Sequence, residues 1–452
     1  MKNDEARGGT STALPEGKVT ESRVAAAEIL ADLRRGELLD AAMQRRSIRL
    51  DWRDRRWLQE LIYGTLRNRE RIDAVLATRV RGGLARLDAD LRDTLRLGAY
   101  QLLYMGSVPS YAAIAQTVEL AKARHGIGAG GLVNAVLRRL DRERDSLEDP
   151  AATAVDSIER LVLTYSHPRW LVVRWVERWG EAVAEQLLAA NNGEAAVYLR
   201  PFGVELAELQ KLLDESEIHY VGCELVPDSL RLSSSVNLTE LGAFKQGFFF
   251  VQDPAATLVT RYASFEPGSL VVDVCAAPGG KSLELARSHV VIAADRSQSR
   301  IRRLAENVGR LRASNVELVV MDAGSPALRP VTSVLLDAPC TGTGTFRRHP
   351  DARWRLKPAD IAVSAAVQRT LLEGAAATVA PGGLLVYSTC SLEPEENEAQ
   401  VEWFLAEHDG WVLEPPPKGA VPEDVLDGLY LRVLPHVHGV DGAFAARLRR
   451  RR

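Results

Sequence analysis

Two cysteines in the C-terminal half of the 452-residue sequence are placed for chemistry. Cys340 ends the segment DAPC and Cys390 lies in the segment YSTCS, and each segment follows a short apolar run. A lone cysteine is usually a small buried residue, but its thiolate is also a strong nucleophile. Since both runs are predicted to be neighbouring parallel strands, we expect the two thiols to share one cleft and to take part in covalent chemistry.

A turn of small residues, DVCAAPGGKS at positions 273–282, lies earlier in the chain. Its glycines and alanines let a ligand approach the backbone, and the amino end of the helix expected after it suits a carboxylate. Taken alone, the motif also fits a tight strand-to-helix connection. The turn runs through Cys275, Ala276, Ala277, Pro278, Gly279, Gly280 and Lys281.

Three acidic residues, Asp295, Asp322 and Asp337, end the next three predicted strands. Asp295 lies roughly twenty residues after the turn begins, where a carboxylate accepts hydrogen bonds from both hydroxyls of a ribose. Asp322 is placed to meet an adenine amino group. Each acid alone also fits a helix N-cap, but three at successive strand ends favour a nucleoside cofactor. A dinucleotide is disfavoured because the turn lacks the Gly-x-Gly-x-x-Gly form.

Alternating strands and helices are expected to position these residues. Short β-branched apolar runs are separated by helix-length segments, which predicts a doubly wound, mostly parallel α/β domain over residues 251–448. The runs are Leu270 to Cys275, Val290 to Ala294, Val316 to Met321, Val334 to Leu336, and Leu384 to Tyr387. Ligands of such sheets bind beyond the carboxyl ends of the strands, where the candidate residues cluster.

The N-terminal part, residues 21–145, has the three-and-four apolar spacing of an all-α domain, including a helix from Leu91 to Met105 that Asp88 can cap. Arginine outnumbers acid between positions 45 and 81, with aromatic residues interleaved. This pattern fits either a face for an RNA backbone or an ordinary solvated helix surface, and spacing alone favours the latter.

Residues 160–250 form a predicted small α+β subdomain whose tryptophans, Trp170, Trp175 and Trp179, have helical spacing and are expected to face a core. Residues 1–20 are expected to be a flexible tail. The arginine-rich end, residues 447–452, either touches RNA or is a solvated tail, and we expect the tail.

Composition sets the broad class of the protein. An apolar fraction of 46% and a charged fraction of 26% are typical of globular proteins, and a net charge of -3 neither supports nor excludes a nucleic-acid partner. The start of the chain lacks a secretory signal and no long apolar run is free of charge, so we expect a soluble, cytoplasmic protein. The four cysteines form no Cys-x-x-Cys pair, so we expect reduced thiols and no metal.

Three motifs together resemble one known family. DVCAAPGGKS, LLDAPCTGTGTFRRHPD and VYSTCSLEPEENE are similar to the RNA cytosine-C5 methyltransferases. LIYGTLRNRERID, LRLGAYQLLYM and NAVLRRL resemble the NusB-like domain of the RsmB (Sun/Fmu) branch, and GFFFVQDPAA matches the entrance to its catalytic domain. The resemblance implies a Rossmann-like domain that uses S-adenosylmethionine, preceded by an all-α NusB-like RNA-binding domain and a small linker subdomain.

The resemblance also implies roles for individual residues. Cys390 would be the nucleophile and Cys340, followed by Thr341 where the family commonly has serine, would assist breakdown of the adduct. The 275–281 turn and the three acids would contact the cofactor. From the chemistry, Lys281 is a candidate source of positive charge for the thiolate, and Asp337 a candidate to hold the cytosine edge and stabilise protonation at N3.

The implied substrate is cytosine 967 of 16S rRNA in the usual ribosomal numbering, as naked RNA or in an assembling small subunit, with the protein acting as a monomer. The alternatives are a transfer RNA substrate, a non-catalytic RNA-binding or assembly factor, and a DNA-type enzyme in which Cys340 is the nucleophile. The loop after Cys340 is either an RNA clamp or a solvent-exposed loop tied by arginine pairs; its candidate RNA contacts are Arg347, Arg348, His349, Arg353 and Trp354.

Overall fold

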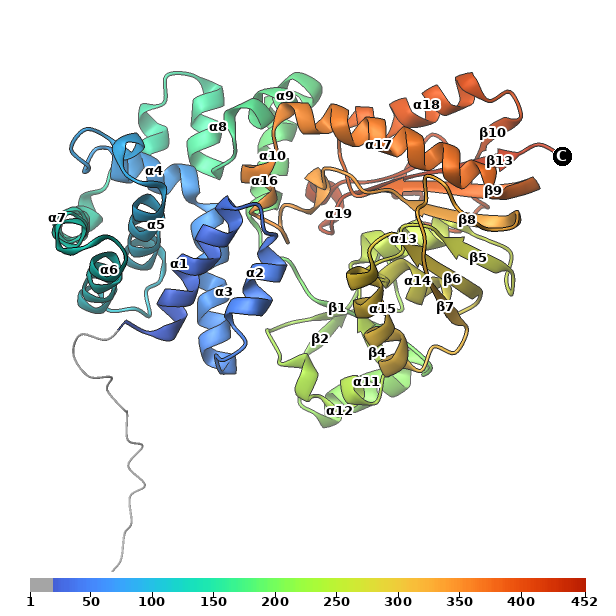
Figure 1. Cartoon of the computed structure of the whole chain (residues 1–452), viewed down its shortest axis with the longest axis horizontal. Helices are drawn as coiled ribbons and strands as arrows, with labels where there is room; N and C mark the ends of the chain where they lie inside the picture. Colours follow the sequence, from blue (N-terminus) through green and yellow to red (C-terminus); the bar gives the residue numbers. More distant parts are fainter. Residues whose placement is uncertain (1–18) are drawn as a thin grey trace, which may run out of the picture. The chain divides into compact units, whose positions relative to one another are not determined.

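The computed structural model describes residues 19–452, which divide after Val173 into two compact units (Figure 1). The first unit is all-α, as the apolar spacing predicted. Its helices are α1 (Glu21–Arg34), α2 (Leu39–Arg46), α3 (Trp52–Arg67), α4 (Arg69–Ala77), α5 (Ala89–Tyr104), α6 (Ser110–His125), α7 (Ile127–Glu143) and α8 (Ser157–Tyr165). Helix α9 (Arg169–Trp179) crosses the boundary between the units.

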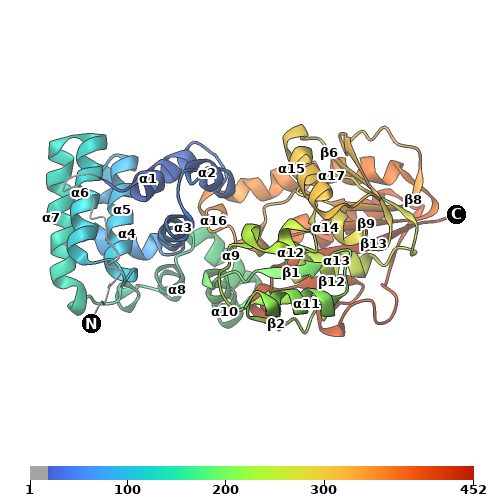
Figure 2. The ribbon, with the colours of Figure 1, turned by 90° about the horizontal axis from the view of Figure 1, so that it is seen from below.

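Local sequence explains where the N-terminal helices begin. The side chain of Asp51 accepts a hydrogen bond from the Asp54 amide at the start of α3, and Asp88 accepts one from the Asp90 amide at the start of α5. These caps satisfy amide groups that have no partner inside the helix. Helices α6 and α7 lie side by side, as Figure 2 shows, and bury apolar residues such as Leu120 and Leu137.

The second unit begins with a small α+β part built on an antiparallel sheet of order β2-β3-β1-β4. Its elements are α10 (Glu181–Asn192), β1 (Tyr198–Pro201), α11 (Leu206–Glu215), β2 (Tyr220–Gly222), β3 (Leu230–Leu232), α12 (Gly242–Lys245) and β4 (Phe249–Val251). Helices α11 and α12 cover the sheet through a core that includes Leu209, Leu230 and Phe249.

A nine-stranded sheet forms the centre of the second unit. Its order is β11-β12-β13-β9-β8-β5-β6-β7, with β10 paired to β13. The strands are β5 (Leu270–Asp273), β6 (Val290–Asp295), β7 (Val316–Val320), β8 (Val331–Asp337), β9 (Val379–Thr389), β10 (Trp411–Glu414), β11 (Leu426–Asp427), β12 (Tyr430–Val433) and β13 (Ala443–Arg450). The strands from β9 to β7 are all parallel, so their carboxyl ends meet at one edge.

Helices cover both faces of this sheet (Figure 1). Val271 packs against α13 (Pro254–Ala263), α14 (Gly280–Leu285) and α15 (Gln298–Leu311), whereas the next residue, Val272, packs against α17 (Pro358–Ala377) and α18 (Glu398–Glu407). Side chains alternate between faces along a strand, so consecutive valines bury in opposite layers. The remaining short helices are α16 (Ala352–Arg355) and α19 (Pro435–His438). The predicted doubly wound α/β fold is confirmed.

The arginine-rich end of the chain departs from the sequence expectation. Residues 447–450 belong to β13, which pairs with both β9 and β10, so the prediction of a solvated tail is wrong for them. Arg447 is buried; its guanidinium donates to the carbonyl oxygens of Tyr262 and Ala263 and forms an ion pair with Glu414. The arginine is tolerated in a central strand because each of these acceptors compensates its loss of hydration.

Two other expectations concern the termini and the membrane. The predicted N-terminal tail lies, up to residue 18, outside the described residues. Over residues 19–452, none of the helices combines the length and the apolar character that a membrane-spanning segment needs.

Candidate active site

The turn after β5 is held by packing as well as by its small residues. The amide of Ala276 donates to the carbonyl of Ala294 in β6 at 2.9 Å, which fixes the turn to the neighbouring strand. Gly279 has a φ of 109°, and a Cβ atom there would lie 2.0 Å from Cδ1 of Leu304 in α15. A glycine is therefore required at this position for the close approach of α15.

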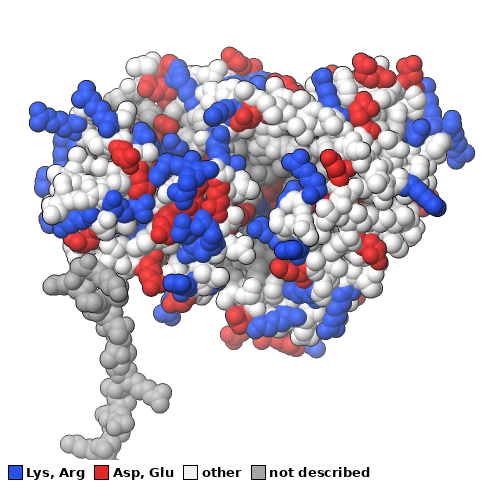
Figure 3. All heavy atoms as spheres, in the orientation of Figure 1, with Lys and Arg blue, Asp and Glu red and all other residues white. Residues whose placement is uncertain are grey.

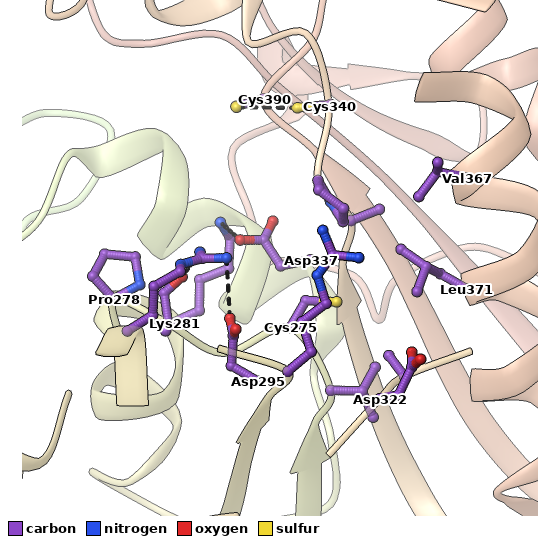
Figure 4. A pocket seen from close by; sticks show the side chains of 17 residues that line it. Cys275, Pro278, Lys281, Asp295, Asp322, Asp337, Cys340, Val367, Leu371 and Cys390 are labelled. Atoms are coloured by element: carbon purple, nitrogen blue, oxygen red, sulfur yellow. Dashed lines mark hydrogen bonds and ion pairs between the residues drawn. The ribbon is translucent and has the colours of Figure 1, made fainter. Parts of the chain in front are cut away.

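A cavity of about 270 Å³ lies at the carboxyl edge of the parallel strands. Most of the predicted site residues line it: Cys275, Ala277, Pro278, Lys281, Asp295, Asp322, Asp337, Cys340 and Cys390. Ala276, Gly279 and Gly280 do not line it, and the first two act through the contacts described above. Figure 4 shows the two cysteine sulfurs at one end of the cavity and Asp295 and Asp322 at the other.

The two cysteines face each other across 3.2 Å between their Sγ atoms (Figure 4). They are close because β8 and β9 are adjacent and parallel, with Asp337 in register with Ser388, so the loops after the two strands start side by side. The contact with Cys390, together with burial, raises the pKa of the Cys340 thiol well above its usual value. Two sulfurs at this separation disfavour a double negative charge, so the pair keeps at least one proton.

Lys281 and Asp337 form an ion pair beside the cysteines. The Lys281 Nζ donates to Oδ2 of Asp337 at 2.7 Å, and the hydroxyl of Ser388 donates to Oδ1 at 2.9 Å. Burial alone would lower the pKa of Lys281, but the Asp337 carboxylate, with a smaller contribution from the Cys390 sulfur, raises it. Lys281 is therefore an ammonium whose charge Asp337 largely compensates.

The opposite end of the cavity carries Asp295 and Asp322. Oδ1 of Asp295 accepts a hydrogen bond from the Ser297 amide at 2.9 Å, while its buried Oδ2 has no hydrogen-bond partner among residues 19–452 and lies 3.2 Å from Nη1 of Arg300. Asp322 is exposed, and its Oδ1 accepts from the Gly324 amide at 2.9 Å. Asp295 thus keeps an acceptor available to a hydroxyl group.

Asp273 and Cys275 lie under the turn. Burial raises the pKa of Asp273 to about 7. The hydroxyl of Ser282 donates to its Oδ2 at 2.6 Å and acts to lower this pKa. Burial also raises the pKa of the Cys275 thiol, and the nearby carboxylates of Asp273 and Asp337 raise it further. Cys275 is consequently a neutral wall of the cavity rather than a further nucleophile.

Three arginines of the loop after Cys340 are engaged by groups of the second unit. Arg347 and Arg348 pair with the buried carboxylates of Asp253 and Asp441, and Arg353 is fully buried. These contacts anchor the loop inside the second unit and favour a loop tied by arginine pairs; an RNA clamp by these three arginines stays a prediction. His349 and Trp354 are half-buried.

Arginines near the start of the N-terminal unit are also paired. Arg45 forms ion pairs with Asp32 and Glu37, and Arg46 forms ion pairs with Asp32 and Glu28. Figure 3 shows basic and acidic side chains next to one another over α1 to α3. For Arg45 and Arg46 the pairing fits a solvated helix surface better than a basic face for RNA.

Several residues around the cavity were not anticipated from the sequence. Arg296 and Arg300 flank Asp295, and Val367 and Leu371 project from α17 (Figure 4). Glu396 lies behind the cysteine loops and contacts both. The two apolar residues lie one helical turn apart in a predicted helix, a signal for an apolar wall, whereas nothing in the sequence indicates where Glu396 faces.

Comparison with known proteins covers almost the whole chain. Residues 20–142 match the NusB family, residues 167–239 match the ferredoxin-like domain of RsmF/B-like methyltransferases, and residues 263–449 match the 16S rRNA methyltransferase RsmB/F model. The probable ribosomal RNA small subunit methyltransferase B of Synechocystis is 36% identical, over 93% of this chain and 98% of that protein. The methyltransferase B of Vibrio cholerae is 35% identical, over 93% and 99%.

This chain belongs to the RsmB/F family of 16S rRNA methyltransferases. The solved structure of PH0851 agrees over 97% of this chain and 99% of that chain, with 28% identity and a TM-score of 0.79. As an RsmB/F methyltransferase, the chain acts on RNA and uses S-adenosylmethionine. The cavity fits that cofactor at its Asp295 end, where a buried carboxylate oxygen without a hydrogen bond among residues 19–452 can accept one from a ribose hydroxyl.

Proposed function

We propose that this RsmB/F methyltransferase transfers a methyl group to carbon 5 of a cytosine in 16S rRNA, at the position-967 class of site, through a covalent adduct with Cys390. The observation that carries the proposal is the 3.2 Å separation of the Cys340 and Cys390 sulfurs inside the cavity. A single thiol would suffice as a nucleophile. A second thiol in contact with it supports a mechanism in which the adduct is both formed and released by the protein.

The chemistry of cytosine explains why a nucleophile is needed. Carbon 5 of cytosine is too weak a nucleophile to take a methyl group from a sulfonium unaided. S-adenosylmethionine supplies the methyl group. Cys390 adds as a thiolate to carbon 6, which makes carbon 5 an enamine carbon able to attack; loss of the carbon 5 proton to a base and breakage of the carbon–sulfur bond then restore the aromatic ring and free Cys390.

The two cysteines divide this work between them. The family resemblance gives the attacking thiolate to Cys390, and the raised pKa of the Cys340 thiol agrees with a role for Cys340 as a proton-bearing partner. Cys340 contacts the Cys390 sulfur directly and therefore lies next to the bond that must break. We assign adduct formation to Cys390 and assistance of its breakdown to Cys340.

Lys281 and Asp337 orient charge around the reacting base. Lys281 interacts electrostatically with the Cys390 sulfur. Asp337, with a side chain 30% exposed, can hold the cytosine edge and stabilise a proton at N3, while Ser388 and Lys281 fix its two oxygens. A preorganised ion pair of this kind needs no rearrangement during the reaction.

The other end of the cavity would hold the nucleoside part of the cofactor. Asp295 would accept hydrogen bonds from the ribose, and Asp322 would meet the adenine amino group, with Cys275 to Lys281 forming the adjoining wall. Leu371 and Val367 of α17 add an apolar side against which an adenine ring can pack.

Product analysis tests the proposed reaction. Purified full-length protein is incubated with labelled S-adenosylmethionine and either naked 16S rRNA or small ribosomal subunits, and the RNA is digested to nucleosides. We expect the label in 5-methylcytidine. Label in another nucleoside would contradict the proposed reaction. Tight RNA binding with no methyl transfer to any RNA would indicate a non-catalytic assembly factor instead.

Bisulfite sequencing separates ribosomal from transfer RNA as substrate. In normal cells, methylation protects one cytosine of 16S rRNA from bisulfite conversion. In cells that lack this protein, we expect bisulfite to convert that cytosine, while the conversion of transfer RNA cytosines stays unchanged. The reverse pattern would assign the enzyme to transfer RNA. The cytoplasmic location and monomeric state stay predictions.

A further inference from the structure

A buried carboxylate lies behind the two cysteine-bearing loops. Glu396 is fully buried in the turn between β9 and α18. Its Oε1 accepts hydrogen bonds from the Thr341 amide at 2.9 Å and from Nε2 of Gln368 at 3.1 Å. Its Oε2 accepts from the hydroxyls of Thr341 and Ser391. All four donors are needed, since burying a carboxylate without such partners costs several kcal/mol.

The donors to Glu396 are the immediate neighbours of the cysteines. Thr341 directly follows Cys340, and Ser391 directly follows Cys390. Gln368 extends the connection, because its Nε2 also donates to the carbonyl of Pro339 at 3.0 Å, on the other side of Cys340. One carboxylate is therefore linked to both loops within one residue of each sulfur.

The position of Glu396 is itself fixed by the sheet. The hydroxyl of Tyr387, a fully buried residue of β9, donates to the backbone carbonyl of Glu396 at 2.6 Å. Burial raises the pKa of Glu396, while the four donors act to lower it. The carboxylate is thus anchored at its backbone and saturated at its side chain.

We propose that Glu396 is a positioning residue that sets the separation of the Cys340 and Cys390 sulfurs by tying both loops to one carboxylate. Without it, the loops keep their strands and the direct bonds farther from the sulfurs, from the Gly344 amide to the Cys390 carbonyl and from the Leu392 amide to Oγ1 of Thr343. They lose the link through the residues that follow each cysteine, so the sulfurs move apart. A displacement of about 1 Å at a reacting group can cost about a hundredfold in rate. The catalytic consequence rests on the proposed function, whereas the geometric claim concerns the two thiols alone.

Disulfide formation measures this geometry without RNA or cofactor. The purified full-length protein is treated with diamide, which takes up two hydrogens as the two thiols become a disulfide, and the Cys340–Cys390 peptide pair is followed by mass spectrometry. We expect Glu396→Ala to slow this cross-link at least about tenfold. Glu396→Gln keeps two polar atoms that can bond the same four groups, and we expect it to stay within about threefold of the unaltered protein.

A control and a second variant keep the test decisive. Glu395→Gln alters the adjacent glutamate, which pairs with Arg174 and touches neither cysteine loop, so it should cross-link at the unaltered rate. If Glu396→Ala fails to fold, Thr341→Val combined with Ser391→Ala removes two of the four donors and keeps the carboxylate; we expect slower cross-linking here too. Unchanged cross-linking in folded Glu396→Ala, or in the double variant, would overturn the proposal.

Steady-state kinetics connects the geometry to catalysis. Glu396→Ala should lower kcat about a hundredfold and leave KM for S-adenosylmethionine within about threefold, with Glu396→Gln recovering most of the loss. If kcat falls while cross-linking stays fast, the residue acts otherwise and the positioning role is overturned. If the unaltered protein methylates no cytosine, the proposed function fails, and the diamide rates still decide the geometric claim.

Discussion

At the β8–β9 end of the cavity the polar side chains are bonded to one another, whereas at the β6–β7 end Asp322 is exposed and Asp295 keeps an oxygen without a hydrogen bond among the described residues. The first end holds the Cys340–Cys390 contact and the Lys281–Asp337 pair. The second end has carboxylates oriented by backbone amides, and Asp295 also pairs with Arg300.

This difference matches what each end must do. Covalent attack depends on fixed distances, so the groups that carry it gain from being locked by neighbours before the substrate arrives. A cofactor that is exchanged at every turnover must instead enter and leave, so its contacts are left partly open. Substitutions at the β8–β9 end should therefore impair chemistry or folding, and those at the β6–β7 end should weaken cofactor binding.

The largest effect is expected from Cys390→Ala. Removing the nucleophile should lower methyl transfer about 10⁴-fold or more, because the proposed mechanism forms the carbon 6 bond with this thiol alone. Cys223→Ala is the matched control, since this buried thiol lies in the small α+β part and does not line the cavity. Transfer of labelled methyl to RNA measures both. Activity of Cys390→Ala within tenfold of the control would remove covalent chemistry from the β8–β9 end.

Arg348→Ala should destabilise the fold and leave RNA affinity nearly unchanged. The substitution deprives the buried Asp253 and Asp441 of their closest cation, and breaking a buried pair costs roughly 3–5 kcal/mol. Denaturant unfolding measures this loss, with exposed Arg302→Ala as the control, expected within about 0.5 kcal/mol. A stable variant whose RNA affinity depends about one unit less steeply on log salt would instead show that Arg348 contacts a phosphate.

Asp273 should make stability fall as the pH rises. Its folded-state pKa of about 7 lies above the usual 3.8, so between these values the folded protein binds more protons than the unfolded chain. Stability present at low pH is then lost as the pH rises through this window, by about 4 kcal/mol at most. Asp273→Asn cannot titrate and should lose this slope between pH 5 and 8. Parallel pH profiles of unfolding free energy for the two proteins would contradict the assignment.

The smallest effects are expected at the open end of the cavity. Asp295→Asn should weaken S-adenosylmethionine binding by about 2 kcal/mol, the usual worth of a hydrogen bond to a charged group. Asp322→Asn, at an exposed position, should weaken it only about threefold. Calorimetric titration gives both constants, and kcat at saturating cofactor should change little. A large loss of kcat without a loss of affinity would erase the distinction between the two ends.

The parallel core of the site was predictable because its signals are local. Each strand that carries a site residue is a β-branched apolar run, and Asp295 and Asp337 are the last residues of β6 and β8. The alternation of strands and helices in the sequence predicted that β8 and β9 are neighbours. This adjacency brings Cys340 and Cys390 together.

Other features depend on contacts that no local pattern reports. Arg447 reads as the start of a charged tail, yet it is buried in β13 because backbone carbonyls of α13 happen to face it. The segment EPEEN contains three glutamates with different surroundings: Glu393 bonds Trp175, Glu395 pairs with Arg174, and Glu396 reaches the cysteine loops. All three residues are glutamates of one short segment, so residue type and local sequence do not predict which of them reaches the cysteine loops.

Trapping of the protein–RNA adduct decides the roles of the two thiols. Full-length Cys340→Ala, incubated with 16S rRNA and S-adenosylmethionine and run on a denaturing gel, should accumulate protein covalently joined to RNA, because the bond forms and is released slowly. Cys390→Ala and the double variant should show none. An adduct in Cys390→Ala that is absent from Cys340→Ala would reverse the roles and make Cys340 the nucleophile.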